Sequence, residues 1–106
     1  MTNFADMLSK AKAMQDKMKE AQDKIKKIEV EGMSGGNLVK VVLTGDYELK
    51  SIDISEKAKK EDLTIINDLI IAAYNNAKEN LKKKSAEELS KVAGGLNLPT
   101  DFKLPF

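Results

Sequence analysis

The chain has 106 residues, enough for a single domain with a limited core, and 33% of them are charged. It contains no cysteine and no histidine, which excludes disulfides, thiolate metal sites and the side chains most used in acid–base and nucleophilic catalysis. No apolar run approaches the roughly 20 residues of a membrane span, and no secretory signal is visible. We therefore expect a soluble, cytoplasmic protein that is not an enzyme, with no cofactor, metal or small-molecule substrate.

The formal net charge of +1 hides a segregation of charge along the chain. Residues 1–28 hold seven lysines against four acids and residues 78–91 hold five against three, whereas residues 29–77 hold five lysines against nine acids. All eighteen basic residues are lysine. Lysine is a point charge suited to phosphate, but it lacks the planar fork with which arginine recognises guanine edges. The two positive segments therefore favour contact with a phosphate backbone over reading of base sequence.

The first segment has apolar residues at alternating spacings of three and four, which predicts a long helix over residues 3–28 with a narrow heptad seam. The seam residues are Phe4, Met7, Ala11, Met14, Met18, Ala21, Ile25 and Ile28. Lysines seven residues apart flank this seam in two rows, Lys10, Lys17 and Lys24 in one and Lys12, Lys19 and Lys26 in the other. Three lysines in a row span ~20 Å of helix, enough to follow a phosphate strand.

Residues 29–54 predict a three-stranded antiparallel meander. The segments 29–31, 38–44 and 47–54 are rich in β-forming residues and are separated by short turns that contain glycine. The alternation of apolar and polar residues breaks near Lys50, where we expect a β-bulge.

After a helical turn or loop, residues 61–93 predict a second long helix whose two halves differ. The first half carries a broad apolar stripe suited to cover a sheet, and the second half is rich in lysine and is expected to project from the body. The stripe consists of Leu63, Ile66, Ile70, Ala73 and Ala77, widened by Ile65, Leu69 and Ala72. Gly94 and Gly95 should end this helix, and residues 94–106, with two prolines, should form an extended tail.

A sheet of three strands with two helices is expected to leave several apolar residues poorly covered within one chain. These residues are Val39, Val41, Ile66 and Ile70. We therefore predict a homodimer whose shared core is built from the sheet and residues 63–77.

Four segments together resemble the YbaB/EbfC family of bacterial nucleoid-associated proteins. They are residues 14–18 (MQDKM), 29–41 (EVEG leading to GGNLVKV), 68–77 (DLIIAAYNNA) and 95–106 (GLNLPTDFKLPF). The chain departs from the family pattern at Thr100–Asp101, where the family often has Pro-Gly, and at 78–80, where relatives often have arginines. The resemblance implies an α+β fold with the order α-β-β-β-α in a single domain over residues 1–106. It also implies a tweezer-like homodimer, a location in the nucleoid and binding of double-stranded DNA through the long helices.

The candidate DNA contacts are lysines of the two long helices. They are Lys10, Lys12, Lys17, Lys19 and Lys24 in the first helix and Lys78, Lys82 and Lys83 in the second. The resemblance favours Lys10 and Lys17. Without arginine, binding is expected to be largely independent of sequence, and to act on DNA conformation and through it on gene expression. Tyr47 and Tyr74 do not lie among lysines, so stacking on single strands is not favoured.

These patterns also have other interpretations. Lysines beside a heptad seam are typical of the solvated face of a coiled coil. A helical dimeric adaptor that binds another protein would share every packing feature, and would differ in the salt dependence of partner binding. A membrane-bound amphipathic helix is disfavoured by the thin Met/Ala seam. Asn75 and Asn76 are expected to have structural roles rather than to contact phosphate.

Overall fold

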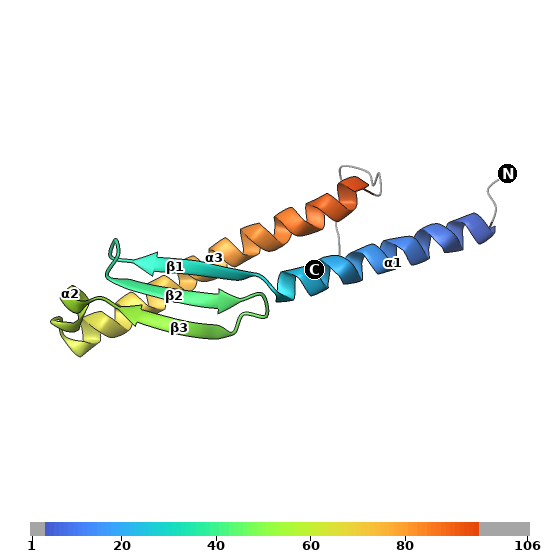
Figure 1. Cartoon of the computed structure of the whole chain (residues 1–106). Helices are drawn as coiled ribbons and strands as arrows, with labels where there is room; N and C mark the ends of the chain where they lie inside the picture. Colours follow the sequence, from blue (N-terminus) through green and yellow to red (C-terminus); the bar gives the residue numbers. More distant parts are fainter. Residues whose placement is uncertain (1–3, 96–106) are drawn as a thin grey trace.

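The computed structural model describes the backbone of residues 4–95 and the side chains of residues 4–92. Its elements follow the order α1 (Phe4–Lys26), β1 (Glu29–Ser34), β2 (Val39–Thr44), β3 (Leu49–Ile54), α2 (Glu56–Lys59) and α3 (Leu63–Gly95) (Figure 1). The predicted α-β-β-β-α order and α+β class are confirmed. The single turn α2 is capped by Ser55, whose side chain accepts a hydrogen bond from the Ala58 N–H (3.1 Å).

Both long helices differ from the prediction at their ends. α1 ends at Lys26 because the next two residues form a tighter turn, in which the N–H of Lys27 donates to the Lys24 carbonyl at 3.1 Å. α3 continues through Gly94 and Gly95, although we expected these glycines to end it. Glycine weakens a helix by about 1 kcal/mol relative to alanine but does not forbid helical geometry. The predicted tail from residue 96 onwards lies outside the described residues.

The three strands form one antiparallel sheet in the order β1-β2-β3. β1 pairs with β2 along its whole length. Between β2 and β3 the register shifts, since Val42 pairs with Ser51 and Leu43 with Leu49. Lys50 is therefore the extra residue, and the bulge predicted near it is confirmed.

The core lies between the sheet and α3, which passes behind the strands in Figure 1. It is built from Val30, Val39, Val41 and Leu43 of the sheet, Ala58 of α2, and Ala73, Ala77 and Leu81 of α3. Val39 and Val41 are 0% exposed within one chain, so the expectation that they need a partner chain is wrong. The reason is that small residues let α3 approach the sheet closely. A methyl group on Gly32 of β1 would collide with the backbone of Ala73 and Ala77.

α3 also closes the outer edge of β1. The Met33 N–H donates to Asn76 Oδ1 (2.9 Å), and Asn80 Nδ2 donates to the Glu31 carbonyl (2.8 Å). An edge strand otherwise leaves such backbone groups open to pairing with another chain. The structural role predicted for Asn76 is confirmed by this contact.

The molecule is elongated, with principal extents of 71 × 23 × 17 Å. We call the sheet, α2 and residues 63–77 of α3 the body. α1 and residues 78–95 of α3 lie side by side, run in opposite directions and extend beyond the sheet, and we call them the arm (Figure 1). The segregation of charge along the sequence thus becomes a segregation in space, because the arm contains both lysine-rich segments and the body contains the acidic one.

Candidate nucleic-acid interface

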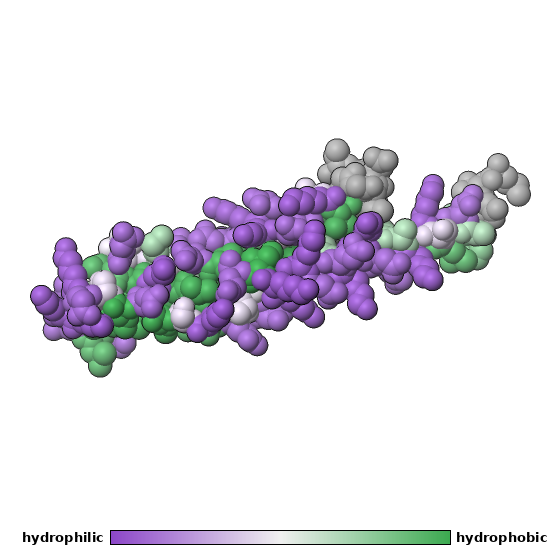
Figure 2. Space-filling view, viewed as in Figure 1, coloured by the Kyte–Doolittle hydropathy of each residue, from purple (hydrophilic) through white to green (hydrophobic). Residues whose placement is uncertain are grey.

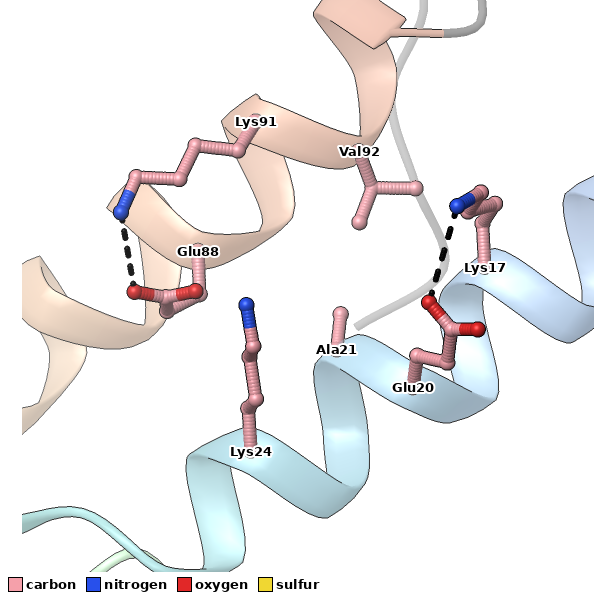
Figure 3. A pocket seen from close by; sticks show the side chains of 7 residues that line it. All are labelled: Lys17, Glu20, Ala21, Lys24, Glu88, Lys91 and Val92. Carbon is pink, nitrogen blue, oxygen red and sulfur yellow. Dashed lines mark hydrogen bonds and ion pairs between the residues drawn. The ribbon is translucent and has the colours of Figure 1, made fainter.

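The two helices of the arm meet along the second half of the α1 seam. Ala21 of α1 is 3% exposed and faces Val92 of α3 (Figure 3). Around this contact lies a hollow of about 280 Å³, which we call the arm hollow. It is lined by Lys17, Glu20, Ala21 and Lys24 of α1 and by Glu88, Lys91 and Val92 of α3.

The charged groups of the arm hollow are three lysines and two glutamates. Lys17 Nζ lies 3.7 Å from Glu20 Oε2, and Lys91 Nζ lies 3.2 Å from Glu88 Oε1. Both pairs join residues three apart on one helix, and the lysine side chains are 58% and 71% exposed. An exposed pair such as Lys17–Glu20 contributes at most about 1 kcal/mol, so a phosphate can compete for the Lys17 ammonium group. Lys24 extends from α1 toward α3 across the hollow (Figure 3).

The two lysine rows predicted for α1 face different sides of the helix. Residues two apart on an α-helix lie about 200° apart around its axis, so one surface can present only one of the rows. Lys17 and Lys24 face the arm hollow, and Lys10 continues their row one heptad further. Lys12 instead lines a separate groove on α1, and Lys19 is exposed one heptad along that second row.

The lysines predicted on α3 lie outside the arm hollow. Lys78 is half-buried, Lys82 lies 3.8 Å from Glu79 Oε1, and Lys83 is exposed. Lys82 lines a different cavity, between α1, the β2–β3 turn and α3. None of the three lines the arm hollow.

Lys91 is the residue that sequence analysis left out of the candidate set. It lines the arm hollow with Lys17 and Lys24. One signal pointed to it, because Lys84 and Lys91 are seven residues apart and so share a side of α3, as the lysines of one α1 row do. Their position relative to α1 depends on how the two helices are aligned, which the spacing alone does not give.

Within residues 4–92 no three histidine, cysteine, aspartate or glutamate side chains are grouped so as to hold a metal ion. Within the same part of the chain, no helix combines the length and the apolar character needed to cross a membrane.

Comparison with known proteins identifies the family. Residues 1–96 match the YbaB/EbfC DNA-binding family, and the chain belongs to it. Over the full length of both chains, it is 43% identical to a nucleoid-associated protein of Granulibacter bethesdensis and 43% identical to one of Rhodospirillum centenum. The fold is similar to the crystal structure of an uncharacterized protein from Helicobacter pylori, with a TM-score of 0.72 and 18% identity, over 89% of this chain and 100% of the other. The resemblance seen in the sequence is confirmed.

Proposed function

We propose that this protein binds double-stranded DNA in the nucleoid as a homodimer, through lysines of the arm and with little dependence on base sequence. The observation that carries the proposal is the gathering of positive charge on the arm, where Lys17, Lys24 and Lys91 line one surface. Lys10 extends this surface along α1, and Lys84 extends it along α3. Membership of a DNA-binding family supports DNA, rather than another protein, as the partner.

The chemistry of these groups favours the phosphate backbone. Ammonium groups bind phosphate as point charges, and the chain has no arginine with which to form bidentate bonds to guanine. The lysines lie on two packed helices, so their spacing is set by the fold rather than by the DNA. DNA that follows this spacing changes its conformation, and flexible sequences will do so at lower energetic cost. Any effect on gene expression would follow from that change.

Exposed apolar residues of the body support the homodimer. Leu63 is 72% exposed and Ile71 59% on α3, and Leu49 is 44% and Ile52 41% exposed on β3. Green surface at the start of α3 marks part of this region in Figure 2. Burial of one such side chain contributes roughly 1.5–3 kcal/mol, which favours contact with a second copy.

A gel-shift competition tests the proposal. Labelled duplexes of unrelated sequence should all be retarded, and affinities for different duplexes should differ by well under the ~10³-fold that separates specific from non-specific sites for dedicated regulators. Binding should weaken steeply as salt is raised, since it releases counterions from DNA. A larger ratio would refute the lack of specificity. No retardation of any duplex would refute DNA binding and favour the adaptor alternative.

A further inference from the structure

α3 covers only part of the apolar face of α1. Phe4, Met7 and Leu8 are 72%, 56% and 55% exposed, whereas Ala21 is 3% exposed. Leu8 lies beside the predicted seam and widens it toward a groove of about 620 Å³. The groove is lined by Leu8, Ala11, Lys12, Met14, Gln15 and Met18.

The covering of α1 stops where α3 stops. Val92 faces Ala21 (Figure 3), and the helices run in opposite directions. Three more residues bring Gly95, the last residue of α3, level with about Met18. Residues 4–17 of α1 therefore continue for ~20 Å beyond the end of α3. We call them the uncovered half of α1, and Figure 2 shows apolar surface toward its amino-terminal end.

An isolated helical stretch of this length is only marginally stable in water, because most helix stability in proteins comes from packing of an apolar face. Four of its apolar positions repeat along one side, at Phe4, Met7, Ala11 and Met14. A segment able to cover this side would stabilise it.

The residues that follow α3 have the composition such a segment needs. From Leu96 to Phe106 the even-numbered residues are Leu96, Leu98, Thr100, Phe102, Leu104 and Phe106, and the odd-numbered ones are Asn97, Pro99, Asp101, Lys103 and Pro105. In an extended chain, residues of equal parity lie on one side. An extended tail thus presents five large apolar side chains on one side and its polar residues and prolines on the other.

The length of the tail and the spacing of its side chains also match the uncovered half of α1. Eleven extended residues reach up to ~36 Å, more than the uncovered half of α1 requires. Alternate residues of an extended chain are ~6.6 Å apart, close to the ~5.4 Å rise of one helical turn. About one apolar tail residue can therefore meet each turn of the helix.

We propose that the carboxy-terminal tail, residues 96–106, binds along the uncovered half of α1 of its own chain, with its even-numbered side chains on the apolar face of the helix. Gly95, the residue before the tail, lies level with the beginning of this surface. Attachment to α3 gives the tail a high effective concentration there, which favours the same chain over a second copy. The proposal does not depend on DNA binding, and its test contains no DNA.

A paramagnetic label can test this because the natural chain has no cysteine and its methionines are well placed. A nitroxide on Lys103→Cys, on the polar side of the tail, should abolish the methyl NMR signals of Met7 and Met14. The signal of Met33, in β1 of the body, should persist and serve as the internal reference. Persistence of all three signals would overturn the proposal.

Two matched variants of the labelled protein separate the two sides of the tail. Leu98→Ser with Phe102→Ser should restore the signals of the α1 methionines, whereas Asn97→Ser with Asp101→Ser should leave them broadened. An equal response to both variants would overturn the proposal that the even-numbered side chains contact α1. Circular dichroism should show the body and α3 folded in both cases.

Mixing two differently labelled samples distinguishes binding of the tail to its own chain from binding to a second copy. Methionine-labelled protein without nitroxide is mixed with an excess of nitroxide-bearing protein that carries no isotope label. The α1 methionine signals should then persist, because the tail covers its own helix. Their loss in the mixed sample alone would show that the occupant is the tail of a second copy and would overturn the proposal.

Discussion

Small residues set the distance between α3 and the sheet. Gly32 lies on the face of β1 that meets α3, where its hydrogen atoms contact the turn of α3 formed by Ala73 to Ala77. Any side chain at this position would have to displace helix backbone rather than a flexible side chain. The full burial of Val39 and Val41 depends on this close approach.

Replacing Gly32 by alanine should therefore destabilise the protein. The added methyl group collides with the backbone of Ala73 and Ala77, and overpacking of this kind costs roughly 1–3 kcal/mol. Urea unfolding followed by circular dichroism measures the loss. Glu31→Ala, at the exposed neighbouring position, is the control and should change the free energy of unfolding by less than about 0.5 kcal/mol. An unchanged midpoint for Gly32→Ala would contradict the close approach of α3.

Asn76 offers a second test at the level of one side chain. Asn76→Ala removes the acceptor for the Met33 N–H and should lower the free energy of unfolding by about 0.5–1.5 kcal/mol. Hydrogen exchange at the Met33 amide should become faster. Asn75→Ala is a matched control on the next residue, which is exposed, and it should leave both measurements unchanged. If the two variants behave alike, the Asn76 side chain does not form a stabilising hydrogen bond with the edge of β1.

At the scale of the element, the two sides of α1 should contribute differently to DNA binding. Lys10, Lys17 and Lys24 lie in the row that faces the arm hollow, and Lys12, Lys19 and Lys26 lie in the row about 200° away. Changing the first row to glutamine removes up to six phosphate contacts per dimer. The slope of log K against log salt should then flatten by up to about five units.

The second row, changed to glutamine in the same way, is the control because it removes the same charge from the same helix. Its slope should change far less, and helix content should survive in both variants since all six lysines are exposed. Affinity should fall similarly for all duplexes when the first row is changed. If both triple variants flatten the slope equally, DNA binding depends on the total charge of the arm, and neither row contacts the phosphates in particular.

The repeat of α1 shows which properties of an element can be predicted from the sequence. Spacings of three and four predict the helix correctly, and they are the same at Met7 as at Ala21. Yet Met7 is 56% exposed and Ala21 is 3% exposed. The difference arises from where α3 ends relative to α1, which is a property of the packed pair. The same alignment places Lys91 and Lys17 around one hollow, so the rows were predictable and their common surface was not.

For the strands, by contrast, the local sequence pattern predicts which side chains are buried. Alternation predicts the buried face of β2 and the bulge near Lys50, because both follow from local residue order. What local order does not give is the thickness of the core. Gly32 pairs with Val41 in the sheet and contacts Ala77 of α3, and only that three-way contact explains why one chain buries Val41 without a partner.

At the scale of the whole molecule, the uncovered apolar surface of the body lies beside β3. α3 packs mainly on β1 and β2, and Asn76 and Asn80 fix its one flank to the edge of β1. Ile52 pairs with Val41 and so lies on the same face of the sheet, but beyond the cover of α3. Ile71 is about 140° around the helix from Asn76, on the flank that faces β3. These residues form the surface on which we expect a second copy to pack.

Disrupting that surface should convert the dimer into a monomer and weaken DNA binding at the same time. We expect the natural protein to sediment with about twice the chain mass of 11.7 kDa and the Ile52→Ser, Ile71→Ser variant to sediment with that mass. Serine adds no charge, so the variant keeps every lysine. Its salt slope should nevertheless fall to about half, because one arm then neutralises half as many phosphates.

Met7→Ser with Leu8→Ser changes two comparably exposed apolar residues of the arm and should leave the sedimenting mass unchanged. A monomeric natural protein would refute the homodimer, and a dimeric variant would move the interface away from β3 and this flank of α3.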